Sequence, residues 1–500
     1  MKRSLSVLAM ATLFSSMSAN AALDVECILR GTCIETQKVM NHLRELQEIA
    51  TNNNGNRAAG TSGHELSANY IAQQLLAANY EVKLVPFRFM KFTKHSALMA
   101  VDTVELEETK DFAVMNYSGS AEVAAKLSAV DISLGAGNQS TSGCEKEDFA
   151  GFQKGSIALI QRGFCNFQDK VENAQAAGAS GVVLFNQGNT ADREAMFSGT
   201  LTEGDGVKIP TVAISYQKAV ELLQNQESII DLKVSAKVEQ KVTHNVIAET
   251  KSGNPDNVVM VGAHLDSVPE GPGVNDNGSG SAGILEIALA MKDSKPNNKV
   301  RFAWFSAEEL GLVGSTRYVE SLSTAEKHKI SLYINVDMIG SPNYMLSVFD
   351  GDGSKFGQKG PEGSAQIEAK FHEIYKSLGV NPVESELNGR SDYAAFSAAG
   401  IAVGGIFTGA EGVMTEEEAA LFNGKAGVAY DSCYHKACDS IDNINEEAME
   451  INSNALAAIT YSFSQSVAEL RSVEKSATSR LKNKVVFPKH LHCHEDVYDI

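Results

Sequence analysis

The chain has 500 residues, of which 43% are hydrophobic, enough for two or three globular domains. It carries 62 acidic and 43 basic side chains, a formal net charge of −19. Because a nucleic-acid-binding surface needs a basic face, this charge argues against a nucleic-acid partner, and it is typical of an exported protein kept in solution by its charge.

The amino terminus has the pattern of a secretory signal peptide. Lys2 and Arg3 form a positive region, residues 5–17 are mostly apolar, and Ala19-Asn-Ala21 is a small-x-small cleavage site. The apolar stretch is too short to span a bilayer, and no later run reaches the ~18–20 residues of a transmembrane helix. We therefore expect residues 1–21 to be a signal peptide and the protein to be secreted, outside the cell or into the periplasm, with no membrane partner.

Six of the seven cysteines fall into three pairs that are close in sequence: Cys27 and Cys33, Cys144 and Cys165, and Cys433 and Cys438. An oxidising compartment would close such pairs into disulfides, although spacing alone does not prove the connectivity. Cys493 is left over.

Residues 35–116 mix two kinds of periodicity. A helical period runs over residues 66–76, and an alternating, strand-like pattern runs over residues 80–87. We interpret this stretch as the first segment of an α/β domain that is interrupted before its sheet is complete.

Residues 117–238 form the interruption. Apolar stretches at 154–167, 178–186 and 209–216 flank a helical stretch at 169–177. The segment resembles the protease-associated (PA) domain, a small β-rich module inserted in several secreted peptidases, and none of its side chains indicates catalysis. Insertion is tolerated in an exposed loop where the ends of the host chain lie close together. The resemblance implies a lid that restricts substrates, and a passive spacer is an equal alternative.

Three apolar strands within residues 239–470 each end in side chains that can bind a metal. These side chains are His264 and Asp266, Glu308 and Glu309, and Asp337. In open α/β sheets, ligands collect at the carboxyl ends of the strands, so we expect them at one edge. Asp276, in a glycine-rich loop before a helical stretch at 284–291, and His435, in a cysteine-flanked segment, extend the set.

Together these residues resemble the secreted two-zinc aminopeptidases of peptidase family M28. The resemblance rests on His264-x-Asp266, Asp276-Asn-Gly-Ser-Gly, Glu308-Glu309, Asn335-x-Asp337-Met and Tyr434-His435. It covers about residues 243–465, and residues 57–63 resemble the amino-terminal segment of the family. It implies a doubly wound, mixed α/β sheet for the peptidase domain, which would consist of residues 35–116 and 239–470.

The resemblance also implies two zinc ions per chain. His264 and Asp337 would hold one ion, and Glu309 and His435 would hold the other. Asp276 would bridge both, since a carboxylate has two oxygens and the ions of two-metal hydrolases lie ~3.5–4 Å apart. Imidazole and carboxylate ligands suit zinc and leave positions for water and substrate. Three carboxylates leave the two divalent ions with a net positive charge, which favours a bridging hydroxide as the nucleophile.

Further roles follow for the neighbours of these ligands. Glu308 is not needed as a ligand because the next residue fills that place, so we predict it to be the general base that passes a proton to the leaving amine. Asp266 could accept the ring N–H of His264 and so set its tautomer. Tyr434 could donate a hydrogen bond to the tetrahedral oxyanion, with simple packing as the alternative. Arg390 and Asp392 resemble a family motif that lines the cleft.

We therefore expect a secreted, monomeric enzyme that hydrolyses the amino-terminal peptide bond of peptides or proteins. A carboxypeptidase or a glutaminyl cyclase of the same fold is the alternative within the wider family. A non-catalytic receptor ectodomain is disfavoured, because all five ligand positions and the base are filled. The sequence does not indicate which amino-terminal side chain is preferred.

Residues 471–500 are rich in Lys and Ser and end in a tract of His and Cys. Such a tract can bind metal, but a solvated terminus is the simpler interpretation. We interpret this tail as a candidate pro-segment that could mask the cleft.

Overall fold

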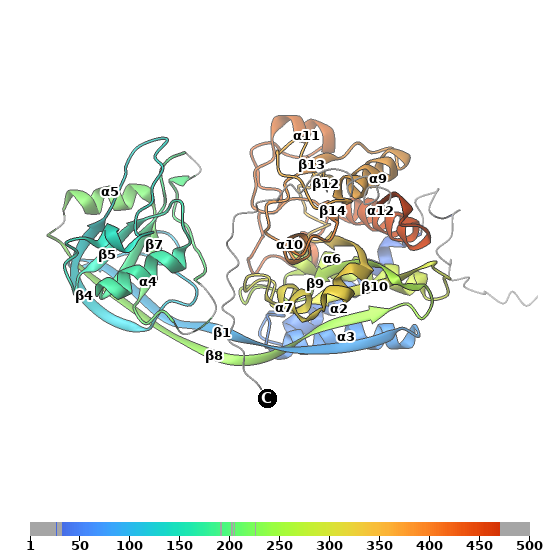
Figure 1. Ribbon diagram of the computed structural model, residues 1–500, viewed down its shortest axis with the longest axis horizontal. Helices are drawn as coiled ribbons and strands as arrows, with labels where there is room; N and C mark the ends of the chain where they lie inside the picture. Colours follow the sequence, from blue (N-terminus) through green and yellow to red (C-terminus); the bar gives the residue numbers. More distant parts are fainter. Residues whose placement is uncertain are drawn as a thin grey trace, which may run out of the picture. The chain divides into compact units, whose positions relative to one another are not determined.

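The computed structural model describes Cys27 and residues 33–470, except residues 191–192, 202–203, 205 and 226. The predicted signal peptide at 1–21 and the candidate pro-segment at 471–500 lie outside the described residues. The described chain packs as two compact units (Figure 1). The first, called the peptidase unit after the family that it resembles in sequence, combines the described residues up to Val85 with those from His244 onward, and the second, the inserted unit, contains Pro86–Thr243.

The division between the units falls within two long strands, β1 (Glu81–Val101) and β8 (Ile229–Glu249). The domain boundaries expected from sequence, at residues 116/117 and 238/239, stay a prediction.

The peptidase unit contains a mixed sheet with the strand order β13-β12-β14-β11-β9-β10-β8. Its other strands are β9 (Asn254–His264), β10 (Asn298–Phe305), β11 (Ile330–Val336), β12 (Ser347–Phe349), β13 (Val383–Ser385) and β14 (Val403–Phe407). Strands β14, β11, β9 and β10 are mutually parallel, whereas β8 and β12 pair antiparallel with their neighbours β10 and β14. This confirms the predicted mixed α/β class.

Helices cover both faces of this sheet, because alternate residues of the buried strands point to opposite sides. Val259 and Val261 pack with α2 (Thr36–Thr51), α3 (Ser62–Ala77), α6 (Gly280–Met291), α9 (Ser364–Ser377) and α12 (Glu446–Gln465). Val258 and Met260 pack with residues of α7 (Val313–Ser321) and α10 (Tyr393–Ala398), and α8 (Thr324–Lys329) lies next to β9 and β11. A further helix, α11 (Glu416–Phe422), packs Phe422 with Met345 and Tyr430.

Local sequence explains where several of these helices begin. The Thr61 side chain accepts a hydrogen bond from the His64 N–H at the start of α3, and Asn445 accepts one from the Ala448 N–H at the start of α12. Both are side chains that satisfy the free N–H groups of a first helical turn. Helix α12 begins at Glu446, where this cap and two first-turn glutamates favour a helix start.

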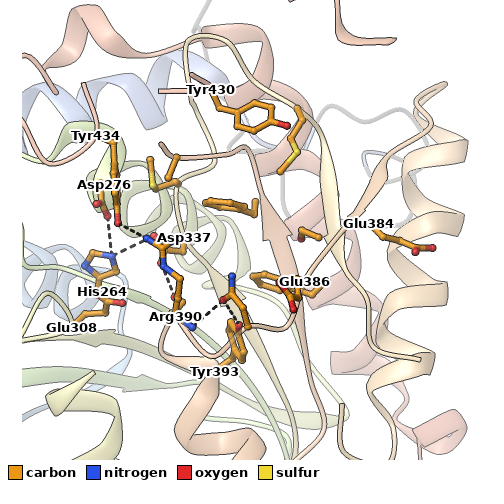
Figure 2. Close-up of a pocket in the computed structure, with 18 of the residues that line it drawn as sticks. His264, Asp276, Glu308, Asp337, Glu384, Glu386, Arg390, Tyr393, Tyr430 and Tyr434 are labelled. Atoms are coloured by element: carbon orange, nitrogen blue, oxygen red, sulfur yellow. Dashed lines mark hydrogen bonds and ion pairs between the residues drawn. The ribbon is translucent and has the colours of Figure 1, made fainter. Parts of the chain in front are cut away.

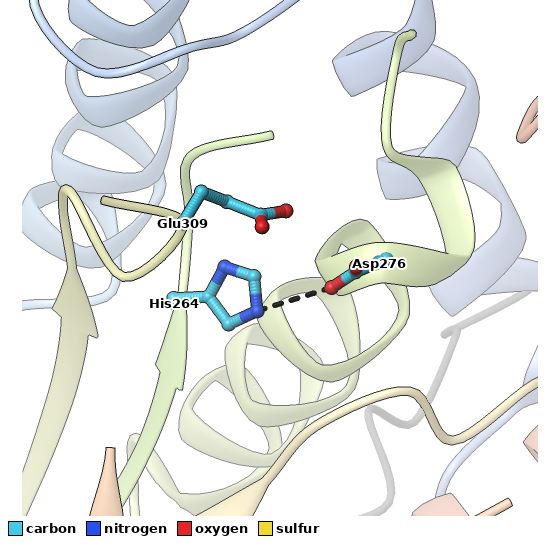
Figure 3. Close-up of side chains that lie close together, drawn as sticks. All are labelled: His264, Asp276 and Glu309. Carbon is cyan, nitrogen blue, oxygen red and sulfur yellow. Dashed lines mark ion pairs between the residues drawn. The ribbon is translucent and has the colours of Figure 1, made fainter. Parts of the chain in front are cut away.

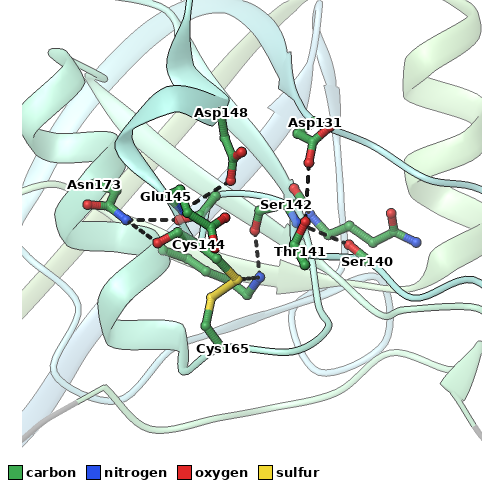
Figure 4. The surroundings of a disulfide bond; sticks show 12 residues. Asp131, Ser140, Thr141, Ser142, Cys144, Glu145, Asp148, Cys165 and Asn173 are labelled. Carbon is green, nitrogen blue, oxygen red and sulfur yellow. Dashed lines mark hydrogen bonds between the residues drawn. A yellow bond between two sulfur atoms is a disulfide. The ribbon is translucent and has the colours of Figure 1, made fainter.

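The inserted unit has a sheet of its own, with the order β8-β4-β5-β6-β7-β3. Its further elements are β2 (Val104–Glu105), β3 (Phe112–Val114), β4 (Ala121–Val130), β5 (Ile157–Gln161), α4 (Phe167–Ala177), β6 (Gly181–Phe185), β7 (Thr211–Ile214) and α5 (Tyr216–Gln224). Alternate residues of β5 and β6 pack with α4 on one face and with α5 on the other. Figure 4 shows the Cys144–Cys165 disulfide of this unit, where the Asn173 side chain donates to the carbonyl of Cys144 at 2.9 Å.

All three cysteine pairs expected from sequence are bonded in the structure: Cys27–Cys33, Cys144–Cys165 and Cys433–Cys438. Among the described residues, no helix has the length and apolarity that a membrane-spanning segment requires.

Candidate active site

The site begins at His264, the last residue of β9, which is 1% exposed. Its Nε2 atom lies 3.2 Å from Asp276 Oδ1 and 3.3 Å from Asp337 Oδ1. Asp337 directly follows β11, a parallel neighbour of β9, so both side chains emerge at the same edge of the sheet. Asp276 lies in a loop segment, η3 (Val274–Ser279), between β9 and α6.

A second imidazole approaches Asp276 from the other side. His435 Nε2 lies 3.1 Å from Asp276 Oδ2 and 3.0 Å from Glu309 Oε2. The two oxygens of Asp276 therefore each face a different histidine. Figure 2 shows His264, Asp276 and Asp337 close together. In Figure 3 the Glu309 side chain lies near those of His264 and Asp276.

These residues fit two divalent cations. Glu309 Oε1 and Asp337 Oδ1 are buried and accept no hydrogen bond from the described residues. A buried carboxylate oxygen without a donor is costly unless a cation approaches it. The nitrogen–oxygen distances of 3.0–3.3 Å are also close to the ~3.3 Å that separates two ligands of one tetrahedral zinc with ~2.0 Å bonds.

The pKa values of the cluster are also those of a site that could hold cations. Burial lowers the pKa of His435, but hydrogen bonds to Asp276 and Glu309 outweigh it and raise the pKa to about 10. Burial likewise lowers the pKa of His264, and nearby carboxylates, led by Asp337, raise it well above its ordinary value. Burial raises the pKa of Glu309 to about 7. Without a cation the cluster therefore holds protons tightly, and a metal must displace them.

Glu308 lies beside these ligands in the cavity wall and is 9% exposed. Burial, together with the negative charges of Glu309 and Asp337, raises the pKa of its carboxyl well above the ordinary value. It is therefore a carboxylate that binds protons readily and has access to the cavity.

The contacts of Asp266 differ from those expected. His264 Nδ1 lies 3.1 Å from the carbonyl oxygen of Asp266 and 3.8 Å from its carboxylate Oδ1. The carboxylate instead accepts the backbone N–H groups of Glu308 at 3.2 Å and Glu309 at 3.4 Å. The backbone carbonyl thus orients the imidazole, and the carboxylate fixes the backbone of the two glutamates.

Several supporting residues are not apparent from sequence. The Asp439 carboxylate accepts the N–H groups of Asn275 at 2.8 Å and Asp276 at 3.0 Å. Ser391 donates to Asp337 Oδ2 at 2.6 Å. Arg57, which is fully buried, donates to the carbonyls of Leu265, Pro272 and Gly273 and so holds the loop between His264 and Asp276. The signals in the sequence are the place of Arg57 in the segment 57–63, Asp439 four residues after His435, and Ser391 next to Arg390.

The glycine at the end of the Asp276-Asn-Gly-Ser-Gly280 motif has a steric reason. A Cβ atom on Gly280 would lie 2.3 Å from the carbonyl oxygen of Val336. Only glycine lets the start of α6 approach the end of β11 this closely, and this approach brings Asp276 next to Asp337.

His435 lies in a short loop that is closed by the Cys433–Cys438 disulfide. Its φ of 57° is in the left-handed region, which a histidine adopts only when its surroundings hold it there. The ring of Tyr434 stacks on the His435 ring at 3.8 Å, and the N–H of Cys433 donates to the Asp431 carboxylate at 2.8 Å. These contacts hold the imidazole toward Asp276.

Of the two residues expected to line the cleft, Arg390 lines the cavity and Asp392 does not. Arg390 lines the cavity, with its guanidinium 2.8 Å from Glu411 Oε1 and 3.5 Å from the Tyr434 hydroxyl. Asp392 is 1% exposed at the start of α10 and does not line the cavity; burial raises its pKa to about 7. The backbone turns into a helix at this point, which carries the Asp392 side chain inward.

A cavity of about 440 Å³ opens beside the cluster. Apart from the metal-binding side chains, much of its wall is apolar or aromatic: Met338, Met345, Phe349, Phe356, Phe407, Ala410 and Tyr430. It can hold an amino-acid side chain next to the histidines, as a ligand site with a few polar groups in an apolar wall does.

Comparison with known families gives two matches. Residues 245–460 match the family described as Peptidase family M28, and residues 123–222 match the PA domain.

Known relatives agree with these matches. A protein named "Aminopeptidase" from Pseudomonas aeruginosa is 51% identical over 432 residues, covering 86% of this chain and 81% of the relative. "Leucine aminopeptidase 2" of Arthroderma otae is 39% identical over 441 residues, covering 87% and 85%.

Solved structures are also similar. An aminopeptidase from Aneurinibacillus sp. strain AM-1 superposes with a TM-score of 0.70 at 28% identity, covering 87% of this chain and 95% of that one. A zinc aminopeptidase from Bacillus subtilis has a TM-score of 0.62 at 27% identity, covering 87% and 96%.

Proposed function

The chain belongs to peptidase family M28, and from this premise we propose that it hydrolyses the amino-terminal peptide bond of peptides with two zinc ions and Glu308 as general base. It is a metallo-aminopeptidase. The observation that carries the two-ion proposal is the geometry of Asp276, whose two oxygens each face a different imidazole at 3.1–3.2 Å.

His264 and Asp337 hold one ion in this proposal, Glu309 and His435 hold the other, and Asp276 belongs to both. Zinc bound there supplies a Lewis acid that polarises the scissile carbonyl and lowers the pKa of water. Glu309 Oε1 and Asp337 Oδ1 support the assignment, since both are buried and accept no hydrogen bond from the described residues.

Glu308 is the base. Its carboxyl lies in the cavity wall beside the ligands, and burial raises its pKa, so it can take a proton from the attacking water. The water oxygen then bonds to the carbonyl carbon, the carbon–nitrogen bond breaks, and Glu308 gives the proton to the leaving amine. Asp266 contributes by fixing the backbone N–H groups of Glu308 and its neighbour.

Tyr434 and Arg390 face the same cavity. Burial raises the pKa of the Tyr434 phenol, so it stays protonated and can donate a hydrogen bond to an oxyanion. Arg390 lies within 3.5 Å of that hydroxyl and adds a positive charge. The apolar part of the wall receives the amino-terminal side chain of the substrate.

We also propose a domain organisation and a location for the whole protein. The peptidase domain consists of residues 35–116 and 239–470, with a PA domain at 117–238. The protein acts as a secreted monomer on peptide or protein amino termini, after removal of residues 1–21. Its disulfides fit an oxidising compartment.

The test is hydrolysis of a leucyl anilide by the purified protein before chelation, after chelation, and after zinc is returned. We expect activity to disappear and then return as about two zinc ions bind per chain. Full activity with a single bound ion would contradict the two-ion site. A peptide with an amino-terminal glutamine, followed by mass, distinguishes the alternative, because a cyclase would release ammonia and leave the peptide bonds intact.

A further inference from the structure

A second group of metal-binding side chains lies on α9 and β13. Glu368, His372 and Glu384 each offer a ligand atom, and these atoms all lie within 4.8 Å of one another. Glu368 and His372 are four residues apart on α9 and so share one face of the helix. Glu384 is on the edge strand β13, where it pairs with Val348 of β12. In Figure 2 its carboxylate lies far from His264, so this group is separate from the ligands around Asp276, although Glu384 lines the same cavity.

Glu368 is the buried member of the group and is 6% exposed. Its Oε2 accepts the backbone N–H of Asp352 at 2.9 Å. Its Oε1 lies 3.9 Å from His372 Nε2, which is too long for a hydrogen bond, and no hydrogen bond from another described residue reaches it. One oxygen of this buried carboxylate therefore faces the His372 imidazole without a hydrogen bond to it.

The surroundings of Glu368 are negative. Burial, together with the negative charges of Asp352, Glu384 and Asp350, raises its pKa to about 7. Among the described residues, the basic side chain close to the Glu368 carboxylate is His372. A cation between these side chains would remove the cost of burying this charge.

An alternative group, Asp350, Asp352 and Glu368, shares one member with the first. Its aspartates already accept hydrogen bonds from the backbone of the following loop. Asp350 accepts the N–H groups of Ser354, Lys355 and Phe356 at 2.8–3.0 Å. Asp352 Oδ1 accepts the Ser354 N–H at 2.7 Å. Because calcium requires six or more oxygens, these occupied carboxylates are a poor calcium site.

We propose that Glu368, His372 and Glu384 bind a third divalent cation, separate from the two ions of the proposed active site. Two carboxylates and one imidazole are the ligand types that zinc accepts, and a water completes the tetrahedron. The 3.9 Å between Oε1 and Nε2 shortens by about half an ångström to reach the ~3.3 Å expected for two ligands of one zinc.

Such an ion would connect α9 to the edge strand. Glu384 and the two residues after it, Ser385 and Glu386, line the substrate cavity. The site therefore fastens one wall of the cavity without taking part in the reaction.

The test compares zinc binding by the full-length wild type, His372→Ala and the control His328→Ala. His372 is partly exposed on α9, and His328 is an exposed helical histidine elsewhere in the same unit, so neither change removes a buried side chain. Each protein is dialysed against a series of free zinc chloride concentrations, and the bound metal is counted by mass spectrometry. Zinc ions bound elsewhere in the chain are common to all three proteins, so they do not affect the difference in zinc count.

We expect the wild type and His328→Ala to bind one more zinc per chain at saturation than His372→Ala. Glu368→Gln should lose the same ion, while the leucyl anilide activity of His372→Ala stays at the wild-type level. Zinc should also raise the melting temperature of the wild type above that of His372→Ala. Equal zinc counts and equal thermal shifts for the two proteins would overturn the proposal. Calcium binding that depends on Glu368 but not on His372 would also overturn it, in favour of the Asp350 group.

Discussion

Glu308 and Glu309 are adjacent in the chain, yet their carboxylates have different surroundings. Both line the cavity, but Glu309 Oε2 lies 3.0 Å from His435 Nε2, whereas Glu308 lies near His264 and Asp337. The Asp266 carboxylate accepts both backbone N–H groups, and these hydrogen bonds fix the backbone from which the two side chains extend. Because both glutamates lie in groups that could hold a metal ion, the proposed division of roles between them needs a direct test.

The first prediction separates these two roles by amide substitution. Glu308→Gln should keep zinc and bind substrate but lose proton transfer, which typically contributes roughly 10²–10⁴-fold. The loss should fall on kcat, with KM little changed. Glu309→Gln should instead lower zinc occupancy, because an amide is a poor replacement for an anionic ligand. Kinetics and metal counts on both variants check this; loss of metal in Glu308→Gln would reverse the two roles.

A second prediction concerns the bridging carboxylate. Because Asp276 faces both imidazoles, Asp276→Ala should release both ions, while His435→Ala should weaken mainly the ion shared with Glu309. Metal counts per chain at controlled free zinc distinguish the variants. Retention of one tightly bound ion in Asp276→Ala would show that the aspartate does not bridge.

The candidate ligands could be proposed from sequence because His264, Glu309 and Asp337 lie at or near the ends of apolar strands, and the other two lie in recognisable motifs. The contacts that orient them could not. Asp266 was expected to accept from His264 through its carboxylate, but its carbonyl takes that place. Asp439 and Ser391 act on Asp276 and Asp337 over long sequence separations, and no periodic pattern encodes such contacts.

At the scale of elements, the parallel strands β9, β10 and β11 determine where the chemistry lies. Their register places Phe305 of β10 beside His264, and Asn335 of β11 beside Gly262, so the three strands end at one edge. These strands were predictable because they are continuous apolar runs. The 21 residues of β1 were not, because most are exposed or half-buried and give only a partial alternation.

The loop that carries His435 provides an element-scale prediction. Replacing Cys433 and Cys438 together by Ser should free this loop and weaken the ion bound by His435, by about tenfold, as loss of ligand support commonly does. The matched control replaces Cys144 and Cys165 by Ser in the inserted unit. Zinc affinity, measured by competition with a chromophoric chelator, should fall for the first pair only. An equal fall in both would mean that the effect is a general loss of stability.

At the scale of the molecule, each unit has its own hydrophobic core. Buried side chains of α6, α12 and β9 pack within the peptidase unit, and those of α4, α5 and β6 pack within the inserted unit. We therefore expect two thermal transitions, of which only that of the peptidase unit falls when zinc is chelated, because a ligand stabilises the unit that binds it. The other transition then reports on the inserted unit alone.

That transition should depend on pH through Lys170, which is fully buried on α4. Its Nζ donates to the carbonyl of Ser142 at 2.5 Å and contacts the sulfur of Cys144 at 3.6 Å. Burial lowers its pKa from 10.5 to about 8. Between these values the unfolded chain binds more protons than the folded one, so stability rises as pH rises from about 8 to 10.5, and below 8 the cost is constant.

The full rise amounts to about 3 kcal/mol at most, at ~1.4 kcal/mol per pKa unit. Urea unfolding of the inserted unit at pH 8 and at pH 10 measures it. Lys170→Met removes the titrating group, so its free energy of unfolding should change less between the two pH values than that of the wild type. Lys154→Met, an exposed lysine of the same unit, should keep the wild-type dependence. If all three proteins show the same dependence on pH, the buried amine is charged in the folded protein, and the polar contacts around it offset the cost of its burial.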